Sequence, residues 1–169
     1  MQKDDLKRER PAGPRTKTPE QALRSLMNLC AKTEKCSGDA RRLMTRWGVE
    51  TAAQERILKT LTDQRFIDDG RYAAAFVREK IRLSGWGAYK IRAALSAKRI
   101  AREVIDGALS ELDGEVMQGR LREAMVRRMR SMDADTLYRT KGRLVRYGLS
   151  LGYDYETVLS LTDELMNEK

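Results

Sequence analysis

The chain has 169 residues, with 34 Lys or Arg against 25 Asp or Glu, and its formal net charge is +9. It contains no histidine, so the commonest general base and transition-metal ligand are missing, and neither an enzymatic mechanism nor a cofactor is expected. No apolar run is long enough to cross a bilayer, so no membrane association is predicted. The positive charge instead favours a polyanion or an acidic protein surface as the partner.

The start of the chain is interpreted as a leader rather than as part of the fold. Residues 1–17 mix charged residues with Pro and Gly and lack the apolar centre of a signal peptide, so they are predicted to form a mobile basic leader. Without a secretion signal, Cys30 and Cys36 are expected to remain reduced thiols in the cytoplasm. Cys30 lies on an apolar helical stripe and is interpreted as a small core residue. A redox pair is the alternative, although its spacing matches no common redox motif.

Three helices are predicted in the first third of the chain. Thr18 is expected to cap the first, with a proline at the first helical position and Gln21 completing a capping box. Apolar residues then recur at the spacing of one helix face, and the pattern repeats up to Gly48, which is expected to end the second helix. Thr51 and Gln54 are predicted to form a second capping box at the start of the third helix.

Helical spacing continues through the rest of the chain. Asp68 is the predicted cap of the next helix, and the Gly-containing stretch 84–87 is expected to break the chain after it. Asp133 or Asp135 is expected to cap a later helix, and Asp154 is expected to cap the last one. Alternating runs of strand type are missing, so about nine helices and no strand are predicted.

The predicted helices form a repeat. When WGV (47–49) is aligned with KRI (98–100) and LGY (151–153), the spacings are 51 and 53 residues and the apolar positions that follow share one register. Units of this size have small cores and need contacts with their neighbours. The predicted fold is therefore all-α, with three tandem three-helix, helix-turn-helix-like repeats in an elongated, curved arrangement. The predicted repeats cover residues 18–66, 67–113 and 114–169.

Basic residues gather in the segments 78–102 and 120–146, and Glu79 is the only acidic residue in the first of them. Arginine prevails in both segments, and its guanidinium makes bidentate contacts to phosphate and carboxylate groups. Trp86 and Tyr89 are candidate aromatic contacts for unstacked nucleic acid, with packing between helices as the alternative. The basic surface predicted to contact the partner comprises Arg78, Arg82, Lys90, Arg92, Lys98, Arg99, Arg127, Arg128 and Arg130.

The adjacent carboxylates of Asp68 and Asp69 raise a separate question. On a helix they would diverge by about 100°, so they do not converge easily on one substrate atom. They are interpreted as a structural junction, in which a carboxylate accepts backbone N–H bonds at a helix start and Arg71 pairs with one of them. Phe66 or Ile67 is expected to pack on the first helical turn. Magnesium binding by the pair, as in a nuclease, is the alternative, but the sequence supplies no clear third ligand.

The stretch RFIDDGRYAAAFVREKIRLSGWGAYKIRAALSAKRI (65–100) combines an apolar pair, two aspartates, Arg-Tyr-Ala, a basic helix and a glycine-containing turn. In this combination it resembles the bacterial RecX regulatory proteins, and the similarity extends more weakly over about residues 18–167. Two positions depart from the family pattern: Arg99 stands where a glycine is usual, and Trp47 precedes Gly48 where a basic residue is frequent. The motif is carried most clearly by Phe66, Ile67, Asp68, Asp69, Arg71, Tyr72 and Phe76.

The resemblance implies a regulator rather than an enzyme. RecX proteins bind the RecA recombinase, chiefly its helical filament on single-stranded DNA, and inhibit or modulate its recombinase, ATPase and co-protease activities. It therefore implies a role in DNA repair and the SOS response, RecA as the partner, and direct contact with DNA as a further interaction. A cytoplasmic monomer without a cofactor is expected. An independent nucleic-acid-binding helical protein is the alternative, because the same basic surface would serve it.

Overall fold

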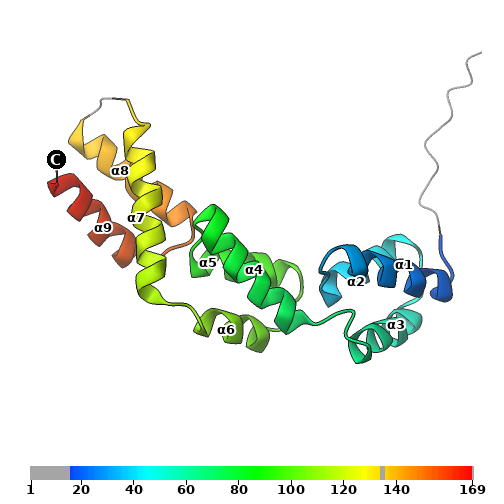
Figure 1. The fold of residues 1–169 in the computed structure, drawn as a ribbon. Helices are drawn as coiled ribbons and strands as arrows, with labels where there is room; N and C mark the ends of the chain where they lie inside the picture. The colour runs from blue at the N-terminus through cyan, green and yellow to red at the C-terminus, as the bar shows by residue number, and fades with distance from the viewer. Residues whose placement is uncertain (1–15, 134–135, 169) are drawn as a thin grey trace, which may run out of the picture. The chain divides into compact units, whose positions relative to one another are not determined.

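The computed structural model describes residues 16–133 and 136–168, over which the chain forms nine α-helices and no strand (Figure 1). The predicted all-α fold is thereby confirmed, while the leader predicted for residues 1–17 lies almost entirely outside the described residues. None of these helices is both long enough and apolar enough to cross a membrane. The helices are α1 (Pro19–Lys32), α2 (Ser37–Arg46), α3 (Thr51–Asp63), α4 (Asp69–Ser84), α5 (Ala88–Ala97), α6 (Arg102–Ser110), α7 (Gly114–Arg130), α8 (Leu137–Ser150) and α9 (Tyr155–Asn167).

The described residues divide into two compact units. The first unit contains residues 16–35 and 39–67, and the second contains the short segment 36–38 together with the described residues after 67. In the first unit, α1–α3 enclose one apolar core. In the second unit, α4–α6 enclose a second core and α7–α9 a third. The helices thus group in threes, whereas the exact repeat boundaries and the elongated, curved arrangement remain predictions.

Each group of three helices is held together by a few fully buried aliphatic side chains. Leu26 and Leu61 occupy the first core, Ile91 and Leu95 the second, and Leu144 the third, all with almost no exposed surface. Burying one such side chain contributes about 1.5–3 kcal/mol relative to leaving it exposed. The apolar stripes read from the sequence therefore point inward, as amphipathic helices require.

The two cysteines lie in different cores and form no disulfide. Cys30 is half-buried and packs against the core of α1–α3, in agreement with its interpretation as a small core residue. Cys36 is completely buried in the core of α4–α6. The redox pair considered from the sequence is therefore not formed.

The turn between the second and third helices of each group has the same backbone conformation. Gly48, Arg99 and Gly152 have φ values of +70°, +59° and +91°, and they are the middle residues of the three aligned triplets. A positive φ is available to glycine without steric cost and is uncommon for other residues. The shared conformation agrees with the register of the repeat, and Arg99 adopts a conformation that the two equivalent positions reach with glycine.

The structure confirms one of the two predicted capping boxes and contradicts the other. The box at Thr18 is confirmed, because its hydroxyl accepts from the Gln21 backbone N–H at 3.3 Å while the Gln21 side chain accepts from the Thr18 N–H at 3.1 Å. The second box is wrong, because Glu50 is the N-cap of α3 and makes no side-chain capping bond. Gln54 is instead buried, and its Nε2 donates to the Val49 carbonyl at 2.8 Å. The spacing suited a box, but burial of Gln54 gave its amide a different partner.

The predicted cap of α8 is also wrong. Thr136 is the N-cap, and its hydroxyl accepts from the Arg139 backbone N–H at 3.4 Å. Asp133 lies ahead of the helix, and Asp135 lies outside the described residues. The predicted cap of α9 is confirmed, because Asp154 Oδ1 accepts from the backbone N–H of residue 157 at 2.8 Å. That hydrogen bond lowers the pKa of the Asp154 carboxyl below its ordinary value.

Within the second unit, the turn before α5 packs directly on the turn before α9. The Gly87 N–H donates to the Leu151 carbonyl at 2.7 Å, and the Tyr89 N–H donates to the Gly152 carbonyl at 3.1 Å. A Cβ on Gly87 would lie 2.4 Å from the Gly152 oxygen, and a Cβ on Gly152 would lie 2.5 Å from the Lys90 nitrogen. The two backbones approach this closely only because both positions are glycine.

Candidate partner-binding surface

Two of the basic residues predicted for the partner-binding surface are occupied by contacts within the second unit. Lys90 Nζ donates to the Ser150 carbonyl at 3.0 Å. The Arg92 guanidinium forms an ion pair with Asp106, and its hydrogen bond is the main reason that the pKa of the Asp106 carboxyl lies below its ordinary value. These two side chains help to hold helices together, so they are less available to a partner than their charge suggests.

The aromatic side chains at the start of the second group form a continuous row. The rings of Tyr72 and Phe76 are stacked with centroids 6.1 Å apart, and Phe76 meets Trp86 edge-on at 6.4 Å. Ammonium groups lie 4.7–5.5 Å from these ring centroids, in the geometry of cation–π contacts. The lysines concerned are Lys80, Lys90 and Lys98.

The two aromatic residues singled out from the sequence therefore differ. Trp86 is half-buried in this row, which favours the interpretation of packing between helices. Tyr89 has 65% of its surface exposed and remains open to contact. Of these two residues, Tyr89 is therefore the one whose ring is exposed enough for a base to stack on it.

Three other predicted residues are exposed and carry uncompensated charge. Arg78, Arg82 and Arg99 have no ion-pair partner among residues 16–133 and 136–168. Arg78 and Arg82 are four residues apart on α4, so their guanidinium groups project from the same face of the helix. In the second group of helices, these three residues are free to bind an anionic partner.

A groove of about 330 Å³ lies between α4 and α7 and contains the two α4 arginines. We call it the α4–α7 groove; it is lined by Arg78, Ile81, Arg82, Leu112, Asp113, Val116, Met117 and Arg120. Its floor is aliphatic, and 52% of the Val116 surface is exposed there. Asp113 is the N-cap of α7, and its carboxylate accepts from the Glu115 N–H at 2.8 Å. The groove thus combines an apolar floor with a cationic rim.

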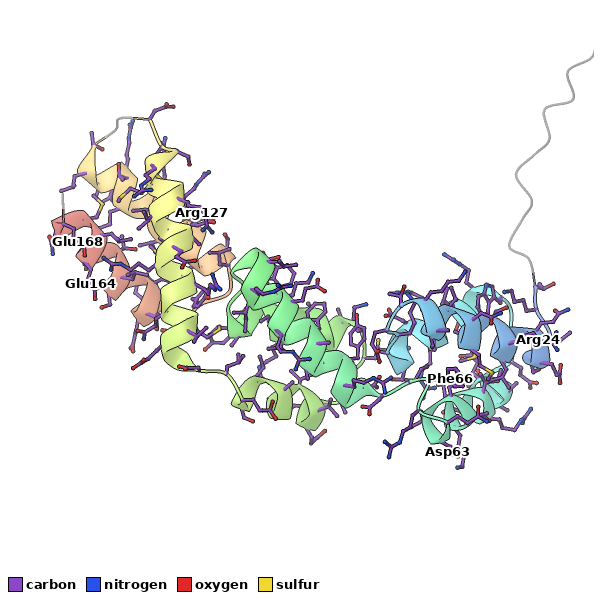
Figure 2. All side chains as sticks on the ribbon, viewed as in Figure 1. Arg24, Asp63, Phe66, Arg127, Glu164 and Glu168 are labelled. Atoms are coloured by element: carbon purple, nitrogen blue, oxygen red, sulfur yellow. The ribbon has the colours of Figure 1, made fainter. Side chains whose placement is uncertain are left out.

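The arginines predicted for the last group lie at the end of α7. Arg127, Arg128 and Arg130 are exposed in its last turn, where positive charge complements the helix dipole. The Arg128 guanidinium lies 5.6 Å from the Tyr147 ring centroid. Figure 2 labels Arg127 on α7, Glu164 on α9 and Glu168, the residue that caps the C-terminus of α9.

The acidic face of α9 is largely neutralised inside the unit. Arg122 of α7 pairs with Glu164 at 3.4 Å and also with Glu168, while Lys141 of α8 pairs with Asp163 at 2.5 Å. These pairs join α9 to both of its neighbouring helices. The acidic character of the last helix is therefore used in packing.

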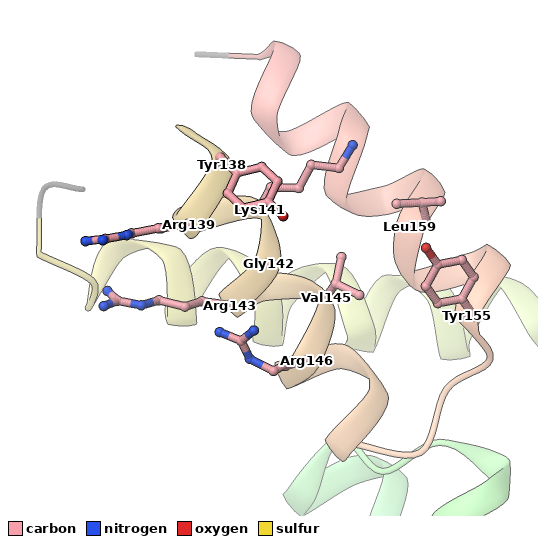
Figure 3. Close-up of a pocket in the computed structure, with 9 residues that line it drawn as sticks. All are labelled: Tyr138, Arg139, Lys141, Gly142, Arg143, Val145, Arg146, Tyr155 and Leu159. Atoms are coloured by element: carbon pink, nitrogen blue, oxygen red, sulfur yellow. The ribbon is translucent and has the colours of Figure 1, made fainter. Parts of the chain in front are cut away.

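The sequence did not single out a second basic hollow, which lies along α8. This α8 groove has a volume of about 610 Å³, and its lining residues are Tyr138, Arg139, Lys141, Gly142, Arg143, Val145, Arg146, Tyr155 and Leu159 (Figure 3). Tyr138 is 88% exposed and Tyr155 is 58% exposed. The basic residues were visible in segment 120–146, but their meeting with Tyr155 depends on how α9 packs on α8.

The two adjacent aspartates have different structural roles. Asp68 is the N-cap of α4 as predicted, and its Oδ1 accepts from the Arg71 backbone N–H at 2.9 Å. Asp69 accepts from both the backbone N–H and the hydroxyl of Ser37, at 2.7 and 2.5 Å. Asp69 thereby fixes the segment 36–38 to the second unit. The sequence could not show this contact, because the two residues are 32 positions apart.

Phe66 and Ile67, which precede the two aspartates, pack differently from the prediction. Ile67 is buried in the core of α1–α3 and Phe66 packs against the same core, so the predicted packing on the first turn of α4 is not their main contact. Among the described residues, no cluster of three or more His, Cys, Asp or Glu side chains could hold a metal ion. Both aspartates therefore accept hydrogen bonds that hold the junction, and the described residues bring no third ligand of this kind to them.

Comparisons with known proteins place these features in a family. The model of the second three-helix domain of RecX matches residues 68–109. The regulatory protein RecX of Clostridium botulinum (strain Alaska E43 / Type E3) is 33% identical over 155 residues, which cover 89% of this chain and 69% of that protein. The RecX of a second Clostridium botulinum strain (Eklund 17B / Type B) is 30% identical over 139 residues, covering 80% of this chain and 63% of that protein. The chain therefore spans about two thirds of the length of these relatives.

Solved structures agree on the fold. A crystal structure of regulatory protein RecX superposes with a TM-score of 0.77 at 22% identity, covering 89% of this chain and 72% of that one. The crystal structure of RecX from Lactobacillus salivarius gives the same TM-score at 17% identity, covering 87% of this chain and 96% of that one. At these identities the structures establish that the fold of tandem three-helix domains is shared.

Proposed function

Because this chain belongs to the RecX family of regulatory proteins, we propose that it binds the RecA recombinase, chiefly as a filament on single-stranded DNA, and inhibits or modulates that filament. The proposal is carried by the match to a regulatory protein RecX over 89% of this chain. RecX family regulatory proteins are not enzymes, in keeping with the absence of histidine from the sequence. On this proposal the chain acts in the cytoplasm as a monomer and needs no cofactor.

The surface that we assign to this function is the set of exposed arginines of the second unit. Arg78, Arg82 and Arg99 carry charge that no described carboxylate balances, and Arg127 and Arg130 add to it at the end of α7. Such a surface suits an acidic protein face, DNA phosphates, or both in turn along a filament. The arginines provide the attraction, while the helical cores hold them in fixed positions.

The first test is the single-stranded-DNA-dependent ATP hydrolysis of RecA from the same source, with this chain added after filaments have formed. We expect hydrolysis to fall at concentrations of the chain that are too low to cover the DNA, because a regulator acts on the filament itself. DNA binding is followed in parallel by fluorescence anisotropy. If hydrolysis falls only once the DNA is saturated, the chain is a competing DNA binder and the proposal is wrong.

A second candidate function, independent binding of single-stranded nucleic acid, is favoured by the α8 groove. In Figure 3 the three arginines Arg139, Arg143 and Arg146 extend from α8, and Tyr155 faces the groove from α9. Arginine contacts phosphates, and an exposed tyrosine ring offers a stacking platform for a base. Gly142 lies between the arginines, so the helix backbone is uncovered at that point. This candidate predicts tight, salt-sensitive binding of DNA in the absence of RecA.

The substitution Gly142→Ala tests this candidate without harming the fold. A Cβ at Gly142 would approach only the end of the flexible Arg146 side chain, at 3.8 Å, and Ala is favoured over Gly in a helix by about 1 kcal/mol. We therefore expect Gly142→Ala to stabilise the chain slightly. If a nucleic acid lies against the helix backbone, the added methyl group should lower its affinity for single-stranded DNA by about three- to tenfold.

The matched control is Gly119→Ala in α7. A Cβ there meets no atom within 4 Å, and the residue does not line the α8 groove, so the same gain in helix stability is expected with no loss of affinity. Anisotropy titrations of a labelled oligonucleotide with both variants, at two salt concentrations, provide the comparison. Equal affinities of the two variants would argue against the α8 groove as the nucleic-acid site.

A further inference from the structure

The α4–α7 groove differs from the rest of the basic surface in having a floor that can hold an apolar side chain. Leu112, Val116 and Met117 approach from the end of α6 and the first turn of α7, and Ile81 approaches from α4. More than half of the Val116 surface is exposed, although an aliphatic side chain next to a hollow of about 330 Å³ would gain stability if covered. A volume of this size is enough for one or two anchoring side chains of a bound segment.

The charge around this floor is positive and only partly compensated. Arg78 and Arg82 find no carboxylate among the described residues, and Arg120 is paired with Glu123 at 3.1 Å on the surface of α7. The one acidic side chain in the lining, Asp113, is engaged in capping α7. The guanidinium groups of at least two arginines can therefore bind carboxylates of a partner directly beside an apolar pocket.

The chemistry of the lining distinguishes a protein from a nucleic acid as the occupant. No aromatic ring lines the α4–α7 groove, so it has no platform on which a base could stack. Aliphatic and methionine side chains instead suit the apolar anchors of a protein segment, and methionine adapts its shape to different anchors. The α8 groove has the opposite character, with two exposed tyrosines among its cations.

We propose that the α4–α7 groove docks a protein segment in which an apolar anchor side chain is followed or preceded by carboxylates. The anchor covers Val116 and Met117, and the carboxylates accept hydrogen bonds from Arg78 and Arg82. This assignment rests on the proposed function, since the segment is expected to belong to the RecA filament. It divides the basic surface into a protein-binding part on α4 and α7 and a nucleic-acid-binding part on α8.

The substitution Val116→Glu tests the assignment with little risk to folding. Residue 116 is the third helical residue after the Asp113 cap, a position where Glu is favoured by the helix dipole and by capping geometry. The new carboxylate removes the apolar contact and can itself pair with the rim arginines, so the groove is blocked from within. We expect the affinity for RecA filaments on single-stranded DNA to fall at least about tenfold, with an unchanged melting temperature.

The double substitution Arg78→Glu/Arg82→Glu should give a loss of the same size or larger, because both carboxylate contacts become repulsive. Its matched control is Arg24→Glu/Arg56→Glu on α1 and α3, which changes the net charge equally and lies outside the groove. Binding is measured by cosedimentation with filaments, using the full chain in every case. If the control loses as much affinity as the groove variant, the effect is one of net charge and the assignment is wrong.

Photo-crosslinking identifies the occupant directly. With p-benzoylphenylalanine in place of Gly119, which neighbours Val116 on α7 but does not line the groove, irradiation of the filament complex should link the chain to a RecA peptide that carries an apolar residue next to Asp or Glu. A crosslink to DNA or to a second copy of this chain, or no crosslink while filament binding persists, would overturn the assignment. If the unaltered chain does not bind filaments at all, the proposed function fails and this assignment fails with it.

Discussion

Replacing Gly152 by Ala is expected to destabilise the second unit by about 2–6 kcal/mol, a large effect for a single methyl group. Two causes add together. Gly152 has a φ of +91°, which strains any residue with a side chain, by about 1–3 kcal/mol. The new Cβ would also lie 2.4 Å from Lys90 Cβ and 2.5 Å from Lys90 N, so the turn before α9 must move away from the start of α5. Such overpacking costs about 1–3 kcal/mol more.

Gly48→Ala is the matched control, because Gly48 occupies the equivalent turn in the first unit. Its φ is +70°, but a Cβ there meets only a methyl group of Thr16 at the ordinary distance of 3.6 Å. Only the backbone strain remains, so a loss of about 1 kcal/mol is expected. Urea unfolding followed by circular dichroism compares the two variants. Equal losses would mean that the contact between Gly152 and the α5 start does not matter for stability.

Removing the unpaired arginines should abolish most binding while leaving the fold intact. The triple substitution Arg78→Ala/Arg82→Ala/Arg99→Ala is expected to lower the affinity for RecA filaments at least about 100-fold, because charge-assisted hydrogen bonds contribute about 1.5–3 kcal/mol each and two of them already account for this loss. Its melting temperature should not fall. Ala keeps the Cβ of residue 99, so the strain at its positive φ is the same in the variant. Cosedimentation and thermal melting measure the two properties on the same samples.

The contrasting triple substitution Lys90→Ala/Arg92→Ala/Lys98→Ala removes the same number of charges from the same segment. These side chains contact Ser150, Asp106 and the aromatic row, so their loss should lower the melting temperature. Their effect on filament binding should be much smaller than that of the first triple substitution. If both variants lose affinity equally, overall charge rather than the exposed arginines governs binding, and the division made from the contacts is wrong.

Much of this fold could be predicted from local patterns in the sequence. Helical spacing of apolar residues, the caps at Thr18, Asp68 and Asp154, and the glycine at 48 all act within a few residues of one another. The register of the three aligned triplets was predictable for the same reason, since each triplet ends one helix and begins the next. Where the prediction was wrong, another local partner replaced the expected cap: the Gln54 amide donates to the Val49 carbonyl five residues back, and Thr136 caps α8 in place of Asp133.

For the candidate partner-binding surface, the sequence predicts which residues are basic but not which of them are available to a partner. The sequence shows that segment 78–102 has a single acidic residue, but it does not show that Arg92 meets Asp106 or that Lys90 meets Ser150. It also gave no sign that Val116 lies beside Arg78 and Arg82, because these residues come from different helices. The α8 groove was missed for the same reason, since Tyr155 reaches it only through the packing of α9.

The sequence by itself determined the helices, the caps at Thr18, Asp68 and Asp154, the grouping of the helices in threes and the positive character of the chain, because these depend on interactions between near neighbours and on composition. Only the tertiary structure decided which cations are available, because a charge is neutralised by whatever carboxylate, carbonyl or ring the fold brings within a few ångströms. It likewise decided that the Asp69 carboxylate accepts hydrogen bonds from Ser37, 32 positions away. The positive charge that is available to a partner is therefore carried by those basic side chains that make no ion pair or hydrogen bond within the fold.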